Sequence, residues 1–238
     1  MKKKVLKTAG KQDASLSGKW RILIVDDHPL FRQGMLRMIS SESDFQVCGE
    51  AESAPKAIDS IRRLDLDLVT VDISLKGTNG LELIKAIKAE KPGLRILTIS
   101  MHDESLYAIR ALRAGASGYV MKQESMEIMM NALREVLAGR MYVSPLLNHQ
   151  ILSGFVHKGE GGDAALTARL SDRELEVFER IGRGDSAGGI ASQLNLSIKT
   201  VESHRAHIKE KLNIATAREL AQLARGWVES EVDLIGGR

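Results

Sequence analysis

The strongest constraint on the fold is an alternation of strand-like and helix-like segments that repeats five times between Trp20 and Arg140. Each short run rich in β-branched residues is followed by a stretch with apolar residues at helical spacing. Strands separated by single helices are typical of parallel βαβ units with right-handed crossovers. The run at 22–25 is apolar without alternation, which indicates a strand covered on both faces. We therefore predict an α/β doubly wound fold with a five-stranded parallel sheet.

The expected elements alternate along this region. In the third helix, Leu81, Ile84 and Ile87 recur at three-residue steps, with charged residues between them. The expected strands cover residues 21–25, 45–49, 66–71, 95–99 and 118–121, and the expected helices cover 30–39, 54–64, 81–89, 104–112 and 125–137.

From residue 166 onward only helical periodicity is present, so the second unit is predicted to be all-α. Ser171 and Glu174 form a capping-box pattern that starts a helix running to about residue 181. A short helix at 187–194, a tight turn with Ser197 as N-cap and a longer helix at 198–212 follow. This order predicts a helix-turn-helix, with a last helix at 217–228.

Composition narrows the class of protein. The single cysteine, Cys48, excludes an intramolecular disulfide framework and a multi-cysteine metal site, and it favours a reducing cytoplasm. Its place inside a strand suggests a small core residue. No apolar run approaches the roughly 18 residues of a membrane span, so no membrane partner is expected. The basic N-terminal segment has no apolar stretch after it and is not expected to be a secretory signal.

Polar residues occupy the carboxyl ends of the expected strands, where a doubly wound sheet places its functional crevice. Three carboxylates meeting there would raise each other's pKa unless a cation neutralised them, and oxygen ligands suit Mg²⁺. A lysine and a hydroxyl opposite could hold phosphoryl oxygens around a carboxylate nucleophile. Each residue alone could equally be a helix cap or a loop residue. The set is Asp26 and Asp27 after the first strand, Asp72 after the third, Ser100 at the fourth and Lys122 at the fifth.

Residues 20–140 resemble a response-regulator receiver domain of the CheY-like type. The resemblance implies that Asp72 is the phosphate acceptor, that Asp26, Asp27, Asp72 and the backbone carbonyl of Ser74 bind Mg²⁺, that Ser100 and Lys122 grip the phosphoryl group, and that Tyr119 switches with Ser100. Lys76 stands where the family usually has proline. The matching segments are 24–28, 71–75 with Gly77, 79–80, 99–100 and 118–122.

Two histidines lie beside this cluster in the sequence. His28 follows the acidic pair, and His102 lies two residues after Ser100. The family uses neither residue as a ligand, so we expect both to be ordinary surface residues.

The helix at 198–212 has two distinct faces. Val201, Ile208 and Leu212 share one face, which must pack inward. The opposite face is short-chained at its centre and could enter a major groove. A plain helical bundle without a DNA role remains the alternative, and the eleven basic and eleven acidic residues of segment 166–238 favour it, because DNA-binding domains usually carry a basic excess. The outward face contains Lys199, Ser203, Ala206 and Glu210, flanked by Thr200, Glu202 and His207. His204 and Arg205 border the apolar stripe and could reach phosphates along its edge.

Residues 166–228 resemble a DNA-binding domain of the LuxR/FixJ type, through segments 170–177, 190–205, 208 and 211–212. The resemblance implies that the last helix supplies dimer contacts. Gly188 and Gly189 stand where the family usually has longer polar residues. Because glycine weakens a helix interior, we expect weaker DNA binding or a helix that orders only on DNA or in a dimer. The residues placed nearest DNA are Lys199, Thr200, Glu202, Ser203, His204, Arg205 and Ala206.

These observations predict a transcriptional regulator of a two-component system and not an enzyme. A sensor histidine kinase would phosphorylate Asp72, and a homodimer formed on activation would read double-stranded DNA. Two alternatives remain. One is a receiver that acts through protein contacts with a degenerate DNA module, and the other is a Mg²⁺-dependent phosphatase with an aspartate nucleophile. The second normally needs another aspartate where Ser74 stands.

The expected organisation has four parts. A basic disordered tail at 1–19 holds six lysines and one aspartate, and it accounts for the positive net charge of the chain. A receiver domain at 20–140, a linker at 141–165 and a helix-turn-helix domain at 166–230 follow. A glycine-rich polar run at 158–163 marks the linker.

Overall fold

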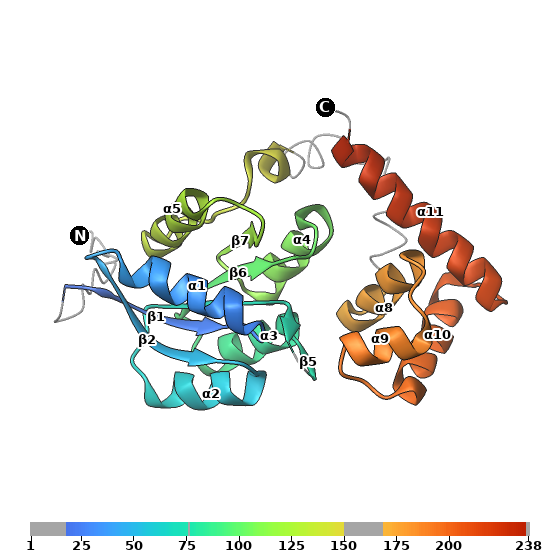
Figure 1. The fold of residues 1–238 in the computed structure, drawn as a ribbon, viewed down its shortest axis with the longest axis horizontal. Coiled ribbons are helices and arrows are strands. Elements are labelled where there is room, and N and C mark those ends of the chain that lie inside the picture. The colour runs from blue at the N-terminus through green and yellow to red at the C-terminus, as the bar shows by residue number, and fades with distance from the viewer. Residues whose placement is uncertain (1–17, 76, 150–168, 237–238) are drawn as a thin grey trace, which may run out of the picture.

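The computed structural model describes residues 18–75, 77–149 and 169–236. It contains an α/β region followed by an all-helical region (Figure 1). Most of the expected basic tail, Lys76 and most of the expected linker lie outside the described residues.

Five parallel strands form the sheet of the first region. Their order is β2-β1-β3-β6-β7, which is the flavodoxin-like order, so the predicted fold class is confirmed. The loop after β3 contains a two-stranded antiparallel ladder that the sequence did not indicate, formed by β4 (Ser74–Leu75) and β5 (Thr78–Asn79). The parallel strands are β1 (Trp20–Val25), β2 (Phe45–Ala51), β3 (Leu68–Val71), β6 (Arg95–Ser100) and β7 (Gly118–Met121).

Helices cover both faces of this sheet, which explains why its central strands are largely apolar. Ile22 and Ile24 pack in a core cluster with residues of the first and fifth helices, whereas Leu23 and Val25 pack with the other three. The helices are α1 (Pro29–Ser40), α2 (Ala54–Arg63), α3 (Gly80–Glu90), α4 (Glu104–Ala114) and α5 (Met126–Leu137).

The second region consists of α8 (Asp172–Gly182), α9 (Ala187–Gln193), α10 (Ile198–Leu212) and α11 (Ala217–Gly236). The capping box of Ser171 and Glu174 is present at the start of α8, and Ser197 accepts a hydrogen bond from the Thr200 amide at the start of α10 (3.0 Å). The last helix continues to Gly236, well beyond its expected end at 228. In the described part of the chain, no helix has the length and apolar character needed to cross a bilayer.

Cys48 does not lie in the core. It lies half-buried on β2, which is an edge strand of the sheet, with Sγ 3.9 Å from the Gln46 carbonyl oxygen. Burial raises the pKa of its thiol. The expectation of a core residue was therefore wrong, because the sequence pattern does not distinguish an edge strand from a central one.

Candidate functional sites

The predicted acidic residues meet at the carboxyl edge of the sheet. β1 and β3 are adjacent and pair Val25 with Val71, so the following residues, Asp26 and Asp72, lie side by side. Both residues are only 2% exposed. One ligand atom from each of Asp26, Asp27, His28 and Asp72 lies within 4.8 Å of the others. The parallel register therefore gathers these carboxylates at one point, as expected.

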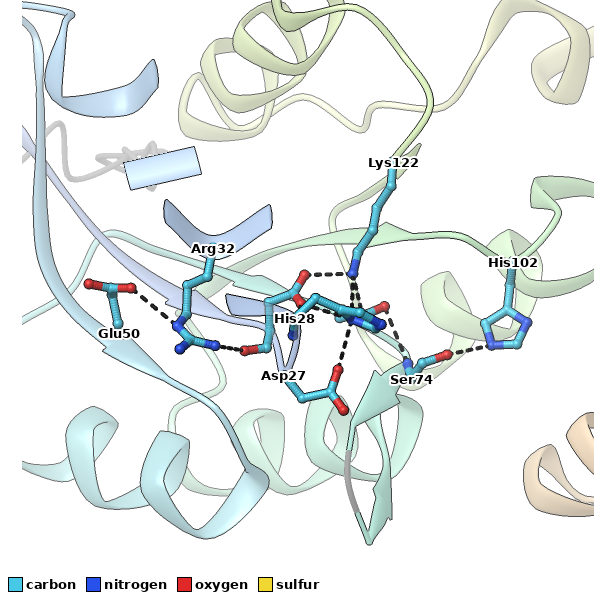
Figure 2. Close-up of polar contacts among 9 residues, drawn as sticks. Asp27, His28, Arg32, Glu50, Ser74, His102 and Lys122 are labelled. Carbon is cyan, nitrogen blue, oxygen red and sulfur yellow. Dashed lines mark hydrogen bonds and ion pairs between the residues drawn. The ribbon is translucent and has the colours of Figure 1, made fainter. Parts of the chain in front are cut away.

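Lys122 is the buried cation of this cluster. It follows β7, and its Nζ lies 2.7 Å from Asp26 Oδ2 and 2.7 Å from Asp72 Oδ2 (Figure 2). Burial and the neighbouring Asp72 raise the pKa of Asp26, although Lys122 opposes the shift. For Asp72, burial acts to raise the pKa, but hydrogen bonds from His28 and Lys122 outweigh it and hold the pKa below its ordinary value. The environment thus keeps Asp72 ionised, as a carboxylate nucleophile requires.

His28 takes part in the cluster, which the sequence did not suggest. Its ring is 58% exposed, yet Nδ1 lies 2.9 Å from Asp27 Oδ1 and 3.3 Å from Asp26 Oδ1. A hydrogen bond to Asp72 is the main cause that raises the pKa of His28. The ring therefore adds a second hydrogen-bonding partner, besides Lys122, to the three carboxylates.

Ser100 and Tyr119, the predicted switch pair, both hold the peptide groups of His102. The His102 amide donates to Ser100 Oγ (3.2 Å), and the Tyr119 hydroxyl donates to the His102 carbonyl oxygen (2.8 Å). Ser100 and Tyr119 are fully buried, and burial raises the pKa of Tyr119 well above its ordinary value. Movement of the Ser100 or Tyr119 side chain would therefore break one of the two hydrogen bonds that hold the His102 backbone.

His102 was expected at the surface, but it is buried. Its Nε2 lies 2.9 Å from Ser74 Oγ, and the Ser74 amide donates to Asp72 Oδ1 (3.2 Å; Figure 2). The ring thus contacts the loop that follows the acceptor candidate. Sequence reasoning missed this residue because its burial depends on packing against the helical region.

The predicted DNA-reading residues lie on α10. Val201 and Ile208 are fully buried, which confirms the inward face. His204 and Arg205 are partly buried, and the Arg205 guanidinium pairs with Glu202 (2.8 Å). Burial lowers the pKa of His204 and so favours its neutral form. Of the other predicted contacts, Thr200 is partly buried, and Lys199, Glu202, Ser203 and Ala206 are exposed.

The zero net charge of the helical region does not describe its α10 surface. Glu174 is buried and pairs with Lys211 of α10 (2.6 Å). Asp172, Glu176 and Glu179 occupy another face of α8, where two of them contact the receiver region. Two of the acidic groups that balance the charge of this region therefore pair with the receiver, so its net charge alone does not decide between a helical bundle and a DNA-binding domain.

The glycines of α9 do not prevent the helix from forming. The Ser186 side chain caps α9 and accepts from the Gly189 amide (3.1 Å), a cap that the sequence reading did not identify. A Cβ at Gly188 would meet only Ser186 Oγ among the described residues, at 4.0 Å.

Gly188→Ala is therefore expected to stabilise the helical region by about 0.5–1 kcal/mol, because it restricts the unfolded chain without a clash. Chemical denaturation followed by circular dichroism measures this change. A lower free energy of unfolding in the variant would show that α9 needs glycine at this position.

A buried aspartate paired with a lysine at the carboxyl edge of a parallel sheet, followed by a helix-turn-helix, is typical of a phosphorylation-controlled DNA-binding regulator. Residues 22–134 match the family described as response regulator receiver domain, and residues 168–224 match bacterial regulatory proteins of the luxR family. The chain belongs to the LuxR-type response regulators, and it is a transcription regulator of a two-component system.

Relatives and solved structures of this family align along most of the chain. The response regulator GacA of Pseudomonas aeruginosa is 34% identical over 205 residues, which cover 86% of this chain and 94% of GacA. The oxygen regulatory protein NreC of Staphylococcus carnosus is 33% identical over 86% of this chain and 96% of its own length. RcsB of Salmonella enterica serovar Typhimurium, solved on promoter rprA with the phosphomimetic BeF3-, has a TM-score of 0.59 and 29% identity over 86% of this chain and 97% of that chain.

Proposed function

We propose that Asp72 accepts the phosphoryl group from a sensor histidine kinase. The observation that carries this proposal is the buried Asp72 carboxylate, kept ionised and held by Lys122 and Ser74. A carboxylate oxygen would attack the phosphorus of the kinase phosphohistidine, and the P–N bond would break with its electron pair on the imidazole. Lys122 and Ser100 then bind the phosphoryl oxygens, and Tyr119 follows Ser100.

The donor set fits Mg²⁺. Asp26, Asp27 and Asp72 offer only oxygen atoms, and the Ser74 backbone carbonyl follows in the same loop. Burial and the neighbouring Asp72 raise the pKa of Asp26, so a bound cation would favour its ionised form. Bound Mg²⁺ would supply charge neutralisation for the transferring phosphoryl group.

We propose that α10 reads double-stranded DNA through Lys199, Thr200, Glu202, Ser203, His204, Arg205 and Ala206. Their exposed or half-buried placement on one helix, and the DNA-bound RcsB structures, support this assignment. A homodimer formed on activation would present two such helices to half-sites about one helical turn apart. Because its partner is DNA, the protein would work in the cytoplasm.

We propose the domain boundaries as a tail at 1–19, a receiver at 20–140, a linker at 141–165 and a DNA-binding domain at 166–230. The family matches at 22–134 and 168–224 fall inside these limits.

Ser74 also supports a regulatory role over an enzymatic one. An aspartate phosphatase would need a general acid at this position, but Ser74 presents a hydroxyl that is hydrogen-bonded to His102. The exposed, short-chained face of α10 likewise favours DNA reading over a degenerate module.

Phosphotransfer from acetyl phosphate tests the acceptor role. With Mg²⁺, the intact mass of the wild-type chain is expected to rise by one phosphoryl group, and Asp72→Asn or a chelator is expected to prevent the gain. Equal labelling of wild type and Asp72→Asn would place the acceptor elsewhere.

A further inference from the structure

The DNA-binding domain contacts the receiver through one face of α8. Asp172, Glu176 and Glu179 recur there at helical spacing, and we call them the α8 acidic stripe. At the outer edge of the contact, Asp172 accepts from Arg110 (2.8 Å) and from Lys85 (3.0 Å). Lys85 is half-exposed, so its pair with Asp172 is solvated and weak, whereas Arg110 and Asp172 are mostly buried.

The inner part of the contact is buried and polar. Glu179 Oε2 accepts from the Tyr107 hydroxyl (3.0 Å) and lies 3.3 Å from His102 Nδ1. The His102 and Glu179 side chains are 8% and 6% exposed, and the His102 and Tyr107 rings lie 4.3 Å apart between centroids. The receiver therefore encloses the Glu179 carboxylate.

The two buried carboxylates of the stripe behave differently. Burial raises the pKa of Glu176 even though Arg173 pairs with it. Burial also acts to raise the pKa of Glu179, but hydrogen bonds and charges from His102, Arg183 and Tyr107 hold it below the ordinary value. The receiver thus favours the negative charge of Glu179 in particular.

His102 connects this carboxylate with the acceptor loop. One ring nitrogen faces Glu179 and the other bonds to Ser74 Oγ, two residues after Asp72. The His102 backbone is held by Ser100 and Tyr119, the residues assigned to the switch. A turn of the Ser100 side chain toward a phosphoryl group would move Oγ away from the His102 amide, and it would thereby free the residue whose ring faces Glu179.

We infer that Glu179 of the DNA-binding domain is a positioning residue for phosphorylation of the receiver. By holding His102, it favours the arrangement in which Ser100 and Tyr119 both bond to the His102 backbone, and it opposes the turn of Ser100 toward a phosphoryl group. The inference rests on the proposed role of Asp72. Linkage is reciprocal, so a contact that phosphorylation weakens must itself oppose phosphorylation.

The outer face of α10 is exposed while α8 contacts the receiver. The contact therefore fixes the position of the DNA-binding domain relative to the receiver. It does not cover the DNA-reading face of α10.

Phosphorylation of the full-length chain by acetyl phosphate with Mg²⁺, followed by intact mass, tests this inference. Glu179→Gln is expected to raise the phosphorylation rate or final phosphorylated fraction by about fivefold or more. Because loss of the DNA-binding domain fold would also free the receiver, circular dichroism of Glu179→Gln must show that the helical region remains folded. In a His102→Ala background, Glu179→Gln is expected to have no further effect, because the two residues act through one contact.

Asp172→Asn is the matched control, since it removes a carboxylate from the same α8 stripe without touching His102. The effect of Asp172→Asn on the phosphorylation rate is expected to be the same in the wild-type and His102→Ala backgrounds. Two results would overturn this inference while leaving the proposed function intact. In one, the wild type takes phosphate and Glu179→Gln takes it at the same rate. In the other, Glu179→Gln still raises the rate in the His102→Ala background. A wild-type chain that takes no phosphate on Asp72 would overturn the proposed function and the inference with it.

Discussion

Gly80→Ala is expected to abolish phosphorylation of the receiver and to lower its free energy of unfolding by about 3 kcal/mol. A Cβ at Gly80 would lie 2.1 Å from the Asp72 carbonyl oxygen and 2.6 Å from the Ile73 Cα. These are backbone atoms, so no side-chain rotation relieves the clash. The Gly80 amide also bonds to the Ile73 carbonyl (2.7 Å), which holds the two segments together. Intact mass after acetyl phosphate treatment and chemical denaturation measure the two effects.

Gly34→Ala supplies the control for this experiment. Gly34 lies within α1, and no atom of the described residues would come within 4 Å of its Cβ. This variant is expected to phosphorylate normally and to gain about 0.5–1 kcal/mol of stability. Normal phosphorylation and unchanged stability in Gly80→Ala would contradict the close approach of Gly80 to the Asp72 backbone.

Gly182→Ala is expected to cost the DNA-binding domain about 3 kcal/mol and to abolish DNA binding while phosphorylation continues. Gly182 ends α8 where it crosses α11, and a Cβ there would lie 2.3 Å from the Ala224 carbonyl oxygen and 2.6 Å from Val228 Cγ2. The added methyl would push the two helices apart and disturb the core beneath α10. Denaturation and fluorescence anisotropy with a selected DNA duplex measure the outcome.

Gly226→Ala is the matched variant on α11, because its Cβ would meet nothing within 4 Å among the described residues. It is expected to retain DNA binding and to be slightly more stable. If Gly182→Ala retained DNA binding and stability as Gly226→Ala does, this result would contradict the close packing of α8 against α11 at Gly182.

The sheet could be predicted from the sequence because its signals are local. Alternation of β-branched runs with helical spacing predicts βαβ units, and the flavodoxin-like order follows from the family resemblance. The β4–β5 ladder was missed because two-residue strands carry no periodic pattern. The end of α11 was placed too early, although Val232 and Ile235 continue the helical spacing of apolar residues after Val228.

The acidic cluster could also be predicted, because parallel strands bring their carboxyl ends to one edge. The strand boundaries and this rule are enough to predict that Asp26, Asp72 and Lys122 lie close together. The partnership of His102 with Glu179 could not be predicted, because it depends on how two separately folded regions contact each other. On the sequence, Glu179 belongs to a charged helix face that is indistinguishable from a solvated one.

The central claim is that phosphate on Asp72 controls DNA binding, and a single affinity comparison tests it. Fluorescence anisotropy would measure the Kd for one duplex at fixed salt concentration, with and without acetyl phosphate, for wild type and Asp72→Asn. We expect the wild type to bind about tenfold more tightly once phosphorylated and Asp72→Asn to show no change. An unchanged Kd in a wild-type chain that carries the phosphate, or an equal gain in Asp72→Asn, would contradict the account.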